Sequence, residues 1–382
     1  MPIGDGHIGA LPCRLLTSAC AVAVVLATGW ALGGPAKDRQ PPAPRAAATR
    51  PKPPGDLPAR KAQLRAELKK LPHKIVFESF RGGNWDLLRI NADGSGLVHL
   101  TRTPKVHEMY PHASADGTKI CFVADEGRRR ARRRNIYYMN ADGAGRTLVA
   151  RNAYQPCWGP AGKTIAYAPG EYDRHSNRGY ATKGVAMYDL STGKVRPHPN
   201  DTLHHLYALC WSPDGRWLLA TVEGAMGYKH ADLAIEASGT KLFPFKIIRG
   251  CRPDVSPDGK KVAWNATDQD IFVADLDLSV SPPKVTNPRV AVSVDKKNKV
   301  YHADWSPDGG YLAFSGGPEA GGQCVGVVAK GWNIYVADPT GKNVAVRVTT
   351  GGVCDKEPDW LPVRGNSNAV KRVGDREPKE NP

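Results

Sequence analysis

One phrase recurs along this chain, and its period limits the possible folds more than any other feature of the sequence. Three copies read CWSPDGRWLLA at 210–220, DVSPDGKKVAW at 254–264 and DWSPDGGYLAF at 304–314. Six places share one position before a turn or strand end, which we call the Trp position: Ala113, Trp158, Trp211, Val255, Trp305 and Trp360. They lie 45, 53, 44, 50 and 55 residues apart, a spacing typical of folds that repeat one supersecondary unit.

The segments after the Trp position combine turn chemistry with strand periodicity. Ser-Pro-Asp-Gly at 212–215 and 256–259 supplies a Pro that presets φ and a Gly that accepts a left-handed φ. An apolar run follows each turn, for example 216–222, and predicts the second strand of the unit. A third strand comes next in each repeat, for example 270–277. A less regular strand closes each unit. Each repeat therefore predicts four short antiparallel strands, which is the unit of a β-propeller blade.

The two ends of the repeat region complement each other. The region begins with 74–80, 86–94 and 95–101, which match second, third and fourth strands of a unit. It ends with 357–363, which matches a first strand. We therefore predict an all-β fold, a six-bladed β-propeller of four-stranded antiparallel blades, in which one blade is shared between the N- and C-terminal ends. Sharing closes the ring and leaves no exposed sheet edge at the junction.

The wording WSPDGxxxAF…NIYVADPTG resembles the repeat of TolB-like propellers, a WD40-like repeat also found in the N-terminal propellers of prolyl-oligopeptidase relatives. The resemblance covers residues 74–363. It implies the fold and says little about activity, because many unrelated roles use this propeller. TolB has an extra N-terminal α/β domain where this sequence has a spacer and one short helix, so we do not expect the TolB role to transfer.

The N-terminal region divides by composition. Residues 1–36 contain the uncharged apolar run 19–32, which is short for a membrane span and predicts a signal peptide or an N-terminal anchor. Residues 37–57 are rich in Pro and Ala and predict a spacer. Residues 58–72 predict a short basic amphipathic helix, which either straps onto the propeller through three leucines or lies on anionic lipid.

The propeller itself is assigned to 73–363, and residues 364–382 predict a disordered tail. The net charge of +16 is unevenly placed along the chain. Residues 37–74 hold eleven Lys or Arg and three Asp or Glu, and the run RRRARRR at 128–134 adds six more Arg. Because the basic charge sits in a tether, a loop and a tail, the sequence does not predict a nucleic-acid-binding body.

Candidate ligand-binding residues lie on the first strand of each blade, which is innermost in a propeller. Residues one and three before the Trp position share a strand face and should approach the channel. From these positions we predict a ligand site at the channel mouth composed of His112, Arg252, His302, Glu357, Asp254, Asp304 and Asp359. The competing interpretation is structural, because an Asp before Trp is routine wording in this family and often caps a neighbouring loop.

The Arg run is predicted to be a second binding element. It lies between a second and a third strand, on the same face of the ring as the connections into the first strands. We expect this loop to bind a carboxylate, sulfate or phosphate group, or else to be a solvated loop, through Arg128, Arg129, Arg130, Arg132, Arg133 and Arg134.

Other chemistry has weaker support in the sequence. We predict no catalytic residues, since no Gly-x-Ser-x-Gly nucleophile motif occurs. His112, His302 and the Asp residues could serve as metal ligands, but their spacing matches no known ligand pattern, and the His pair at 204–205 sits in a loop before the fourth blade; we therefore predict no metal and no cofactor. Cys324 and Cys354 are candidates for a disulfide, since both fall in loops expected at the channel mouth.

These features predict an exported, non-enzymatic propeller of the periplasm or cell envelope, soluble after signal cleavage or tethered to the membrane through 19–32. Its expected partner is an envelope protein or an acidic glycan, and not a specific nucleic acid. The alternative is a metal-assisted polysaccharide lyase, or another enzyme acting on an acidic glycan at the channel mouth. A channel plugged by side chains favours the binding module, and His and carboxylate groups around an open pocket favour the enzyme.

Overall fold

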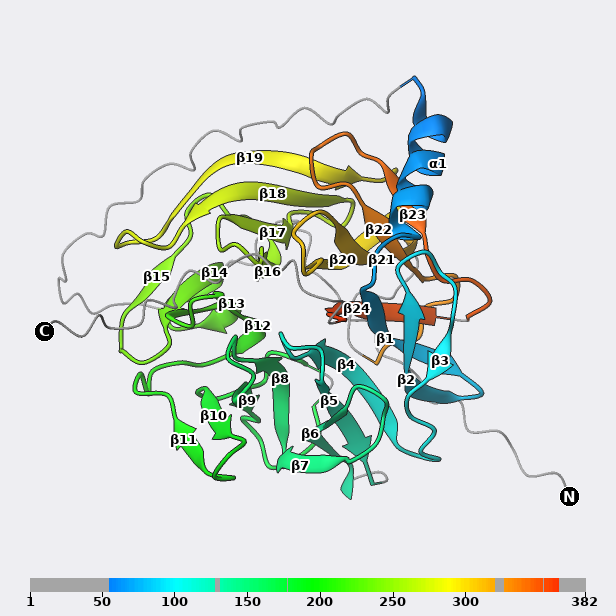
Figure 1. Ribbon diagram of the computed structural model, residues 1–382. Helices are drawn as coiled ribbons and strands as arrows, with labels where there is room; N and C mark the ends of the chain where they lie inside the picture. The colour runs from blue at the N-terminus through cyan, green and yellow to red at the C-terminus, as the bar shows by residue number, and fades with distance from the viewer. Residues whose placement is uncertain (1–54, 128–130, 177, 320–325, 353, 364–382) are drawn as a thin grey trace, which may run out of the picture. The chain divides into compact units, whose positions relative to one another are not determined.

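The strands form six four-stranded antiparallel sheets arranged around a common centre (Figure 1). The computed structural model describes residues 55–127, 131–176, 178–319, 326–352 and 354–363. All of them belong to the unit Arg50–Pro382. Five sheets use four consecutive strands, and the sixth joins the last strand to the first three, so the predicted six-bladed propeller with a shared blade is confirmed.

Within each blade the strands follow one another from the centre of the ring to its rim. Blade 1 contains β24 (Cys354–Leu361), β1 (Lys74–Arg81), β2 (Asn84–Asn91) and β3 (Val98–His99). Blade 2 contains β4 (His107–Ala113), β5 (Lys119–Glu126), β6 (Arg133–Asn140) and β7 (Thr147–Ala150). Blade 3 contains β8 (Ala153–Trp158), β9 (Thr164–Pro169), β10 (Ala186–Asp189) and β11 (Val195–Pro197).

The second half of the ring follows the same plan. Blade 4 contains β12 (Leu206–Trp211), β13 (Trp217–Ala225), β14 (Tyr228–Glu236) and β15 (Leu242–Pro244). Blade 5 contains β16 (Cys251–Val255), β17 (Lys261–Asn265), β18 (Asp270–Asp277) and β19 (Lys284–Ser293). Blade 6 contains β20 (Asn298–Trp305), β21 (Leu312–Pro318), β22 (Asn333–Ala337) and β23 (Ala345–Arg347).

Antiparallel order within every blade sorts the connections onto two faces of the ring. The connections from second to third strands, and those into the next first strand, lie on one face, which we call the mouth face. The Ser-Pro-Asp-Gly turns and the connections from third to fourth strands lie on the other, which we call the turn face. In the turn at 212–215, Gly215 has φ +72°, and the Ser212 hydroxyl donates to Asp214 at 2.5 Å, so the repeated phrase is used for turning.

A β-bulge occurs in the first strand of every blade. The strand pairing skips a residue at the bulge, for example between Met109 and His112 in β4. The residue three before the Trp position has a left-handed φ of 50–60° in all six blades: Tyr110, Gln155, Ala208, Arg252, His302 and Glu357. A bulge places two residues opposite one and re-aims their side chains, so simple alternation along the strand does not hold at these positions.

Side chains of the preceding blade satisfy the backbone of these bulges. The N–H of Ala208 donates to Gln155 Oε1 at 2.9 Å, and that of His302 donates to Asn265 Oδ1 at 2.9 Å. The N–H of Glu357 donates to Ser315 Oγ at 3.0 Å, which connects blade 6 to the shared blade 1. A buried amide needs a partner, so each of these side chains fastens one blade to the next.

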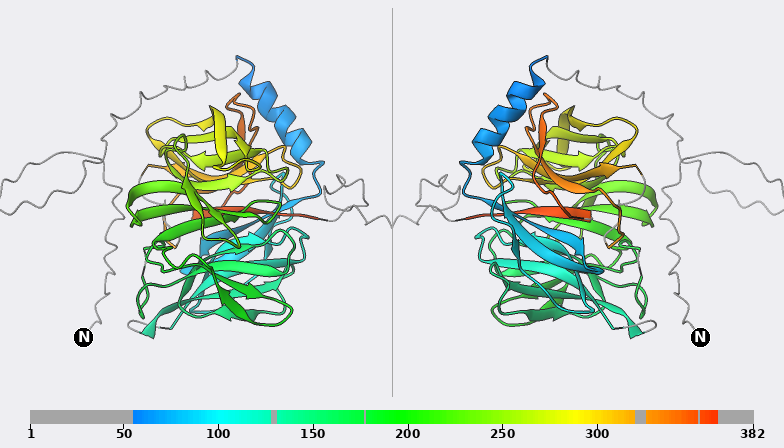
Figure 2. Two further views of the ribbon diagram at one scale, coloured as in Figure 1. Left: turned by 90° about the vertical axis from the view of Figure 1, so that its left-hand side faces the viewer. Right: turned by 90° about the vertical axis from the view of Figure 1, so that its right-hand side faces the viewer.

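Helix α1 (Leu57–Leu68) lies at the rim beside β22 and β23, as both side views show (Figure 2). Leu64 and Leu68 are buried in a cluster with Val346 and Val348 of the last blade. Glu67 accepts a hydrogen bond from the Tyr311 hydroxyl at 3.2 Å. The apolar side of the helix is therefore covered by the propeller, as the strap interpretation requires. Among the described residues, no helix is long and apolar enough to cross a bilayer.

Candidate functional site

The two predicted sets of channel residues meet at the centre of the ring. They enclose a cavity of about 30 Å³, which is room for one or two water molecules. Its lining comes from five blades: Tyr110, His112, Ala208, Leu209, Cys210, Arg252, Pro253, Asp254, His302, Ala303, Asp304 and Asp359. Most of the residues around this cavity are buried, and we call this region the plugged centre.

Arg252, His302 and Glu357 form one charged cluster on three neighbouring blades. His302 Nδ1 lies 2.8 Å from Glu357 Oε2, and Arg252 Nη1 lies 3.5 Å from the same oxygen. Arg252 Nη2 also donates to the Tyr301 hydroxyl, and the guanidinium lies 4.3 Å from the centre of the Tyr301 ring. Both contacts go to Glu357 Oε2, whereas Oε1 of this fully buried carboxylate has no hydrogen-bond partner among the described residues.

The charges of this cluster follow from its geometry. Burial alone would raise the pKa of Glu357, but Arg252 and His302 hold the pKa of this carboxyl at about 2. The pKa of Arg252 lies well above its usual value, because the neighbouring Tyr301 and Glu357 outweigh its burial. A paired arginine and carboxylate at neutral pH leave little net charge at the centre for an incoming ligand.

A ring of acidic side chains lies one step further along the same strands. Asp359 Oδ1 accepts the N–H of Ala113 at 2.8 Å, and Asp304 Oδ2 accepts the N–H of Trp360 at 2.7 Å. Asp254 Oδ2 accepts the N–H of Trp305 at 2.9 Å. Each aspartate therefore joins the Trp position of the following blade to its own blade, which supports the structural interpretation of the Asp-Trp wording.

Burial raises the pKa of all three aspartates of this ring. Withdrawal from solvent raises the pKa of Asp359 to about 8, and it raises that of Asp304 well above the usual value with help from Asp359 and Asp254. Burial lowers the pKa of His112 to about 4, and its Nδ1 accepts the N–H of Trp158 at 3.4 Å. Its hydrogen bonds to backbone N–H groups of the neighbouring blades make this ring part of the packing between blades.

The Arg run is only partly a loop, which corrects the prediction of six projecting arginines. Arg128, Arg129 and Arg130 lie outside the described residues. β6 begins at Arg133, and Arg134 stands directly opposite Asp125 across the strand pair. Arg134 is buried and makes two hydrogen bonds of 2.7 and 2.9 Å to this carboxylate.

Two further side chains contact the same carboxylate. Arg132 donates to Asp125 at 2.9 Å, and His175 Nε2 lies 2.9 Å from it. Although burial would raise it, Arg134 and His175 hold the pKa of Asp125 well below its usual range. Arg133 lies 3.7 Å from the exposed Asp173. Arg134 is therefore a structural residue and is removed from the predicted binding loop.

The predicted disulfide falls partly outside the described residues, since Cys324 is not among them. Cys354 is buried at the start of β24, and its Sγ accepts the N–H of Ala329 at 3.4 Å. Burial raises the pKa of the Cys354 thiol to about 11. The Cys324–Cys354 disulfide remains a prediction.

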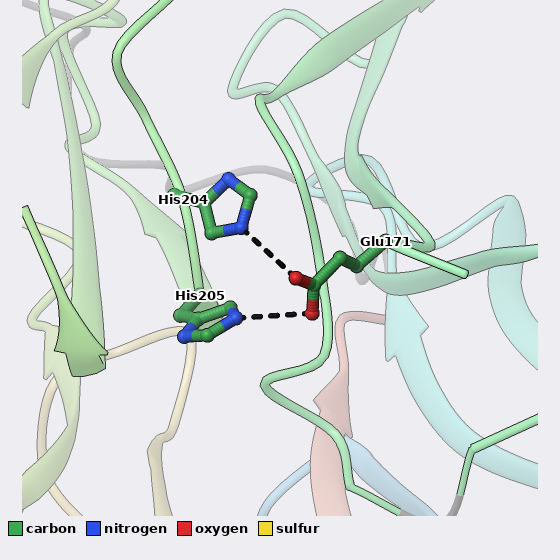
Figure 3. A group of neighbouring side chains, drawn as sticks. All are labelled: Glu171, His204 and His205. Carbon is green, nitrogen blue, oxygen red and sulfur yellow. Dashed lines mark hydrogen bonds and ion pairs between the residues drawn. The ribbon is translucent and has the colours of Figure 1, made fainter.

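A group that the sequence did not indicate as a site lies on the mouth face between blades 3 and 4 (Figure 3). The Glu171 carboxylate points between two imidazoles, with Oε1 3.4 Å from His204 Nε2 and Oε2 3.0 Å from His205 Nε2. One ligand atom from each of the three lies within 4.8 Å of the others. The sequence signal was weak, because Glu171 precedes the His pair by 33 residues and only the folded connections bring them together.

An open cavity adjoins this group. It has a volume of about 470 Å³ and includes His204 in its lining, and the other lining residues are Thr202, Ala225, Met226, Tyr228 and Leu242. Its mixed lining of imidazole, hydroxyl and apolar groups suits a small polar molecule or a side chain of a partner. The mouth face thus has its open cavity beside blade 4, away from the plugged centre.

No family model matches the chain, and no curated protein matches it. Solved structures do. TolB from Acinetobacter baumannii is 17% identical, with 80% of this chain and 72% of TolB covered and a TM-score of 0.55. A protein from Agrobacterium tumefaciens that is assigned to TolB is 14% identical, with 77% and 100% covered and a TM-score of 0.50.

A further similar structure is hydrazine synthase from Kuenenia stuttgartiensis, which is 11% identical, with 78% of this chain and 48% of that protein covered and a TM-score of 0.54. At these identities the likeness concerns the fold alone, since propellers host many unrelated activities. The repeat wording, the six four-stranded blades and the shared blade agree with it. In fold, the chain is a TolB-like six-bladed β-propeller.

Proposed function

We propose that this chain is an exported, non-enzymatic binding module of the cell envelope whose mouth face binds an acidic protein or an acidic glycan. The supporting observation is an asymmetry of charge between the two faces. Among the described residues, the connections of the mouth face contain twelve Lys or Arg and six Asp or Glu, whereas those of the turn face contain seven of each. A face with excess basic charge attracts acidic partners and speeds their association.

The residues behind this count follow from the strand bounds. The basic residues of the mouth face are Arg102, Lys105, Arg132, Arg151, Arg174, Arg178, Lys183, Lys246, Arg249, Lys296, Lys297 and Lys330. Its acidic residues are Glu171, Asp173, Asp201, Asp268, Asp295 and Glu319. The turn face has Arg146, Lys163, Lys194, Arg216, Lys241, Lys260 and Lys342 against Asp93, Asp116, Asp142, Asp214, Asp258, Asp308 and Asp338.

The plugged centre favours binding over catalysis at the channel itself. Arg252, His302 and Glu357 are occupied with one another, and the cavity beside them admits little more than water. A substrate would have to displace these contacts to reach the axis. The loops of the mouth face are accessible, and binding residues are often found on loops that a rigid scaffold positions.

The experiment compares two charge-reversal variants of the full chain. The first replaces four exposed mouth-face cations, Lys246, Arg249, Lys296 and Lys297, by Glu. The matched control makes the same change of net charge on the turn face, at the exposed Lys163, Lys194, Lys241 and Lys260. Each protein is immobilised and tested for capture of acidic proteins from an envelope extract and of a polyuronate and a sulfated polysaccharide.

We expect the first variant to lose capture and the control to retain it, with capture by the unchanged protein falling as salt is raised. Equal capture by both variants would refute the mouth face as the binding surface. The nature of the captured polymer decides between a protein and a glycan partner.

A second candidate function is an enzyme that acts on an acidic glycan with help from a metal ion. One observation favours it, namely the Glu171, His204 and His205 group beside an open cavity on the same basic face. The test is incubation of uronate polymers with the protein and divalent metal, followed by measurement of chain length and of the ultraviolet absorbance of unsaturated products. Intact polymers after long incubation would exclude this activity for those substrates.

A further inference from the structure

The two imidazoles and the carboxylate on the mouth face are held in place by backbone hydrogen bonds. The connection that carries Glu171 folds back on itself, with the N–H of Glu171 donating to Ala181 O at 3.0 Å and a bridge between Gly170 and Thr182. The next connection docks on this hairpin, because Lys183 bridges His204 and the N–H of His205 donates to Thr182 O at 2.9 Å. The three side chains therefore start from a fixed frame.

The hydrogen bond on the far side of His205 decides which of its ring nitrogens carries the proton. His205 Nδ1 lies 3.0 Å from the carbonyl oxygen of Glu223, which can only accept, so Nδ1 carries a proton. In a neutral imidazole Nε2 then presents a lone pair, and this lone pair lies 3.0 Å from a Glu171 oxygen. Two acceptors at this distance repel each other unless a proton or a metal cation lies between them.

This arrangement is the usual one for a histidine that binds a metal. A ligating imidazole generally donates its other N–H to a carbonyl or a carboxylate, which fixes the tautomer and the ring orientation. His205 also has a left-handed φ of 52°, and the residue at the same place in blade 3, six before the Trp position, is Asn152 with φ 48°. His205 therefore occupies a backbone position at which the neighbouring blade has an asparagine, a residue that tolerates a left-handed φ.

The separations between the ligand atoms suit a small divalent ion. Zinc bonds to imidazole nitrogen and carboxylate oxygen are about 2.0–2.2 Å, so neighbouring ligand atoms in a tetrahedral site lie roughly 3.4 Å apart. The contacts of 3.4 Å to His204 and 3.0 Å to His205 are close to this length, and they run to different oxygens of Glu171, Oε1 and Oε2. One ligand atom from each residue lies within 4.8 Å of the others, so rotation of the carboxylate and of the imidazoles would complete the site.

We propose that Glu171, His204 and His205 form a binding site for one divalent transition-metal ion, with zinc as the best-matched ion, and that the site keeps an open coordination position. Two imidazoles and one carboxylate are a ligand set that leaves the fourth tetrahedral position to water or an oxygen donor. His204 is 39% exposed at its side chain and lines the 470 Å³ cavity, so this position is accessible to a ligand there. An oxygen donor such as a carboxylate of a bound molecule fits this position.

The non-metal explanation is a protonated imidazole paired with the carboxylate, and the two make different predictions. An ion pair needs one histidine, as in the His230–Glu223 contact of 2.6 Å nearby, which has no second imidazole. It gives no stoichiometric, saturable binding of zinc. His230→Ala is therefore a matched control, because it removes a histidine paired with a glutamate on the same face and leaves the three proposed ligands intact.

The test uses the full chain purified without an affinity tag and stripped with a chelator. Calorimetric titration with zinc and elemental analysis after dialysis measure affinity and stoichiometry. Cobalt substitution gives the visible spectrum of a tetrahedral site if the ion binds as proposed. The variants are Glu171→Gln, which keeps the shape of the side chain, and His205→Asn, which keeps a residue suited to the left-handed backbone. Circular dichroism of the metal-free variants checks that they fold.

We expect one zinc per chain in the unchanged protein and in His230→Ala. In Glu171→Gln and His205→Asn we expect the dissociation constant to rise by at least roughly 100-fold, since a lost ligand costs more than the lost supporting contacts of a metal site. Absence of stoichiometric zinc in the unchanged protein, or equal binding by all variants, would overturn the proposal. The test is independent of whether the mouth face binds an acidic partner.

Discussion

Replacement of Arg252 by Met should destabilise the whole ring, because it leaves Glu357 without its strongest partner at the centre. Glu357 is fully buried, and the Arg252 side chain is 9% exposed, so solvent cannot compensate the loss. Breaking a buried ion pair by removing one partner costs about 3–5 kcal/mol. The change also removes the contact of the guanidinium with the Tyr301 ring.

The pKa of Glu357 gives a second route to the magnitude. Its folded value of about 2 lies below its usual value of 4.5. A depressed carboxyl pKa stabilises the folded state above the unfolded value and loses this contribution as pH falls toward the folded value. The difference corresponds to about 3 kcal/mol at neutral pH. This contribution is shared by Arg252, His302 and Lys356, with Arg252 the largest of the three, and for a domain of this size each kcal/mol lowers the melting temperature by roughly 2 °C.

The assay is urea unfolding and thermal melting of Arg252→Met between pH 2 and 7. Arg249→Met is the control, because Arg249 is exposed in the connection that leads into the same strand and should change stability by at most about 0.5 kcal/mol. Arg252→Met with Glu357→Gln should recover part of the loss, since the uncompensated charge is gone. A loss below about 1 kcal/mol for Arg252→Met, or a double variant no more stable than the single one, would refute this account of the plug.

Two further predictions concern polar contacts that join neighbouring strands or blades. Asp359→Asn keeps the acceptor for the N–H of Ala113 but removes a carboxyl whose folded pKa of about 8 lies above its usual 3.8. A carboxyl with a raised folded pKa stabilises the folded state fully below its unfolded pKa, and this contribution is lost as pH rises toward 8. The melting temperature of the variant should therefore depend less on pH between 4 and 8 than that of the unchanged protein. An identical pH profile for the two proteins would contradict this. Arg134→Met leaves Asp125 with only Arg132 and His175 and should cost about 3 kcal/mol in urea unfolding, whereas Arg133→Met should cost about 0.5 kcal/mol or less. Equal losses in the two variants would show that the buried pair is not special.

The architecture could be predicted because turn and strand signals are local and repeat. Ser-Pro-Asp-Gly fixes where a first strand ends, and the apolar run after it fixes the second strand, so the blade boundaries need no tertiary information. The same reasoning assigned 357–363 to a first strand, and β24 spans Cys354–Leu361. The shared blade followed from counting strands at the two ends.

The bulges could not be predicted, because an extra residue in one strand leaves no mark in an alternating pattern. Arg252 and His302 tolerate a left-handed φ only because the preceding blade supplies an acceptor for their N–H groups, Thr221 Oγ1 at 2.9 Å and Asn265 Oδ1 at 2.9 Å. These partners lie 31 and 37 residues earlier in the chain. Tertiary contacts thus override the local preference.

The candidate functional residues were also hard to predict from the sequence, as the Arg run and the proposed metal ligands show. A run of six Arg predicts a surface loop by composition, yet the register that opposes Arg134 to Asp125 buries it. Conversely, Glu171 and the His204–His205 pair look unrelated in sequence and meet only because two connections dock on Thr182. Composition gives the number of charged side chains in a segment, and the strand register decides which of them are buried in ion pairs.

The candidate binding surface can be located by asking which polar groups are already bonded within the fold. At the centre, Arg252 pairs with Glu357, and the aspartates before the Trp position accept backbone N–H groups of the next blade. A polar group satisfied in this way stabilises the ring and has little left to offer a ligand. On the mouth face the surplus of basic side chains remains exposed, and His205 Nε2 and Glu171 Oε2 face each other across 3.0 Å without a shared donor when the imidazole is neutral. The exposed basic side chains and the Glu171, His204 and His205 group therefore lie in the connections of the mouth face, and the search for ligands begins there.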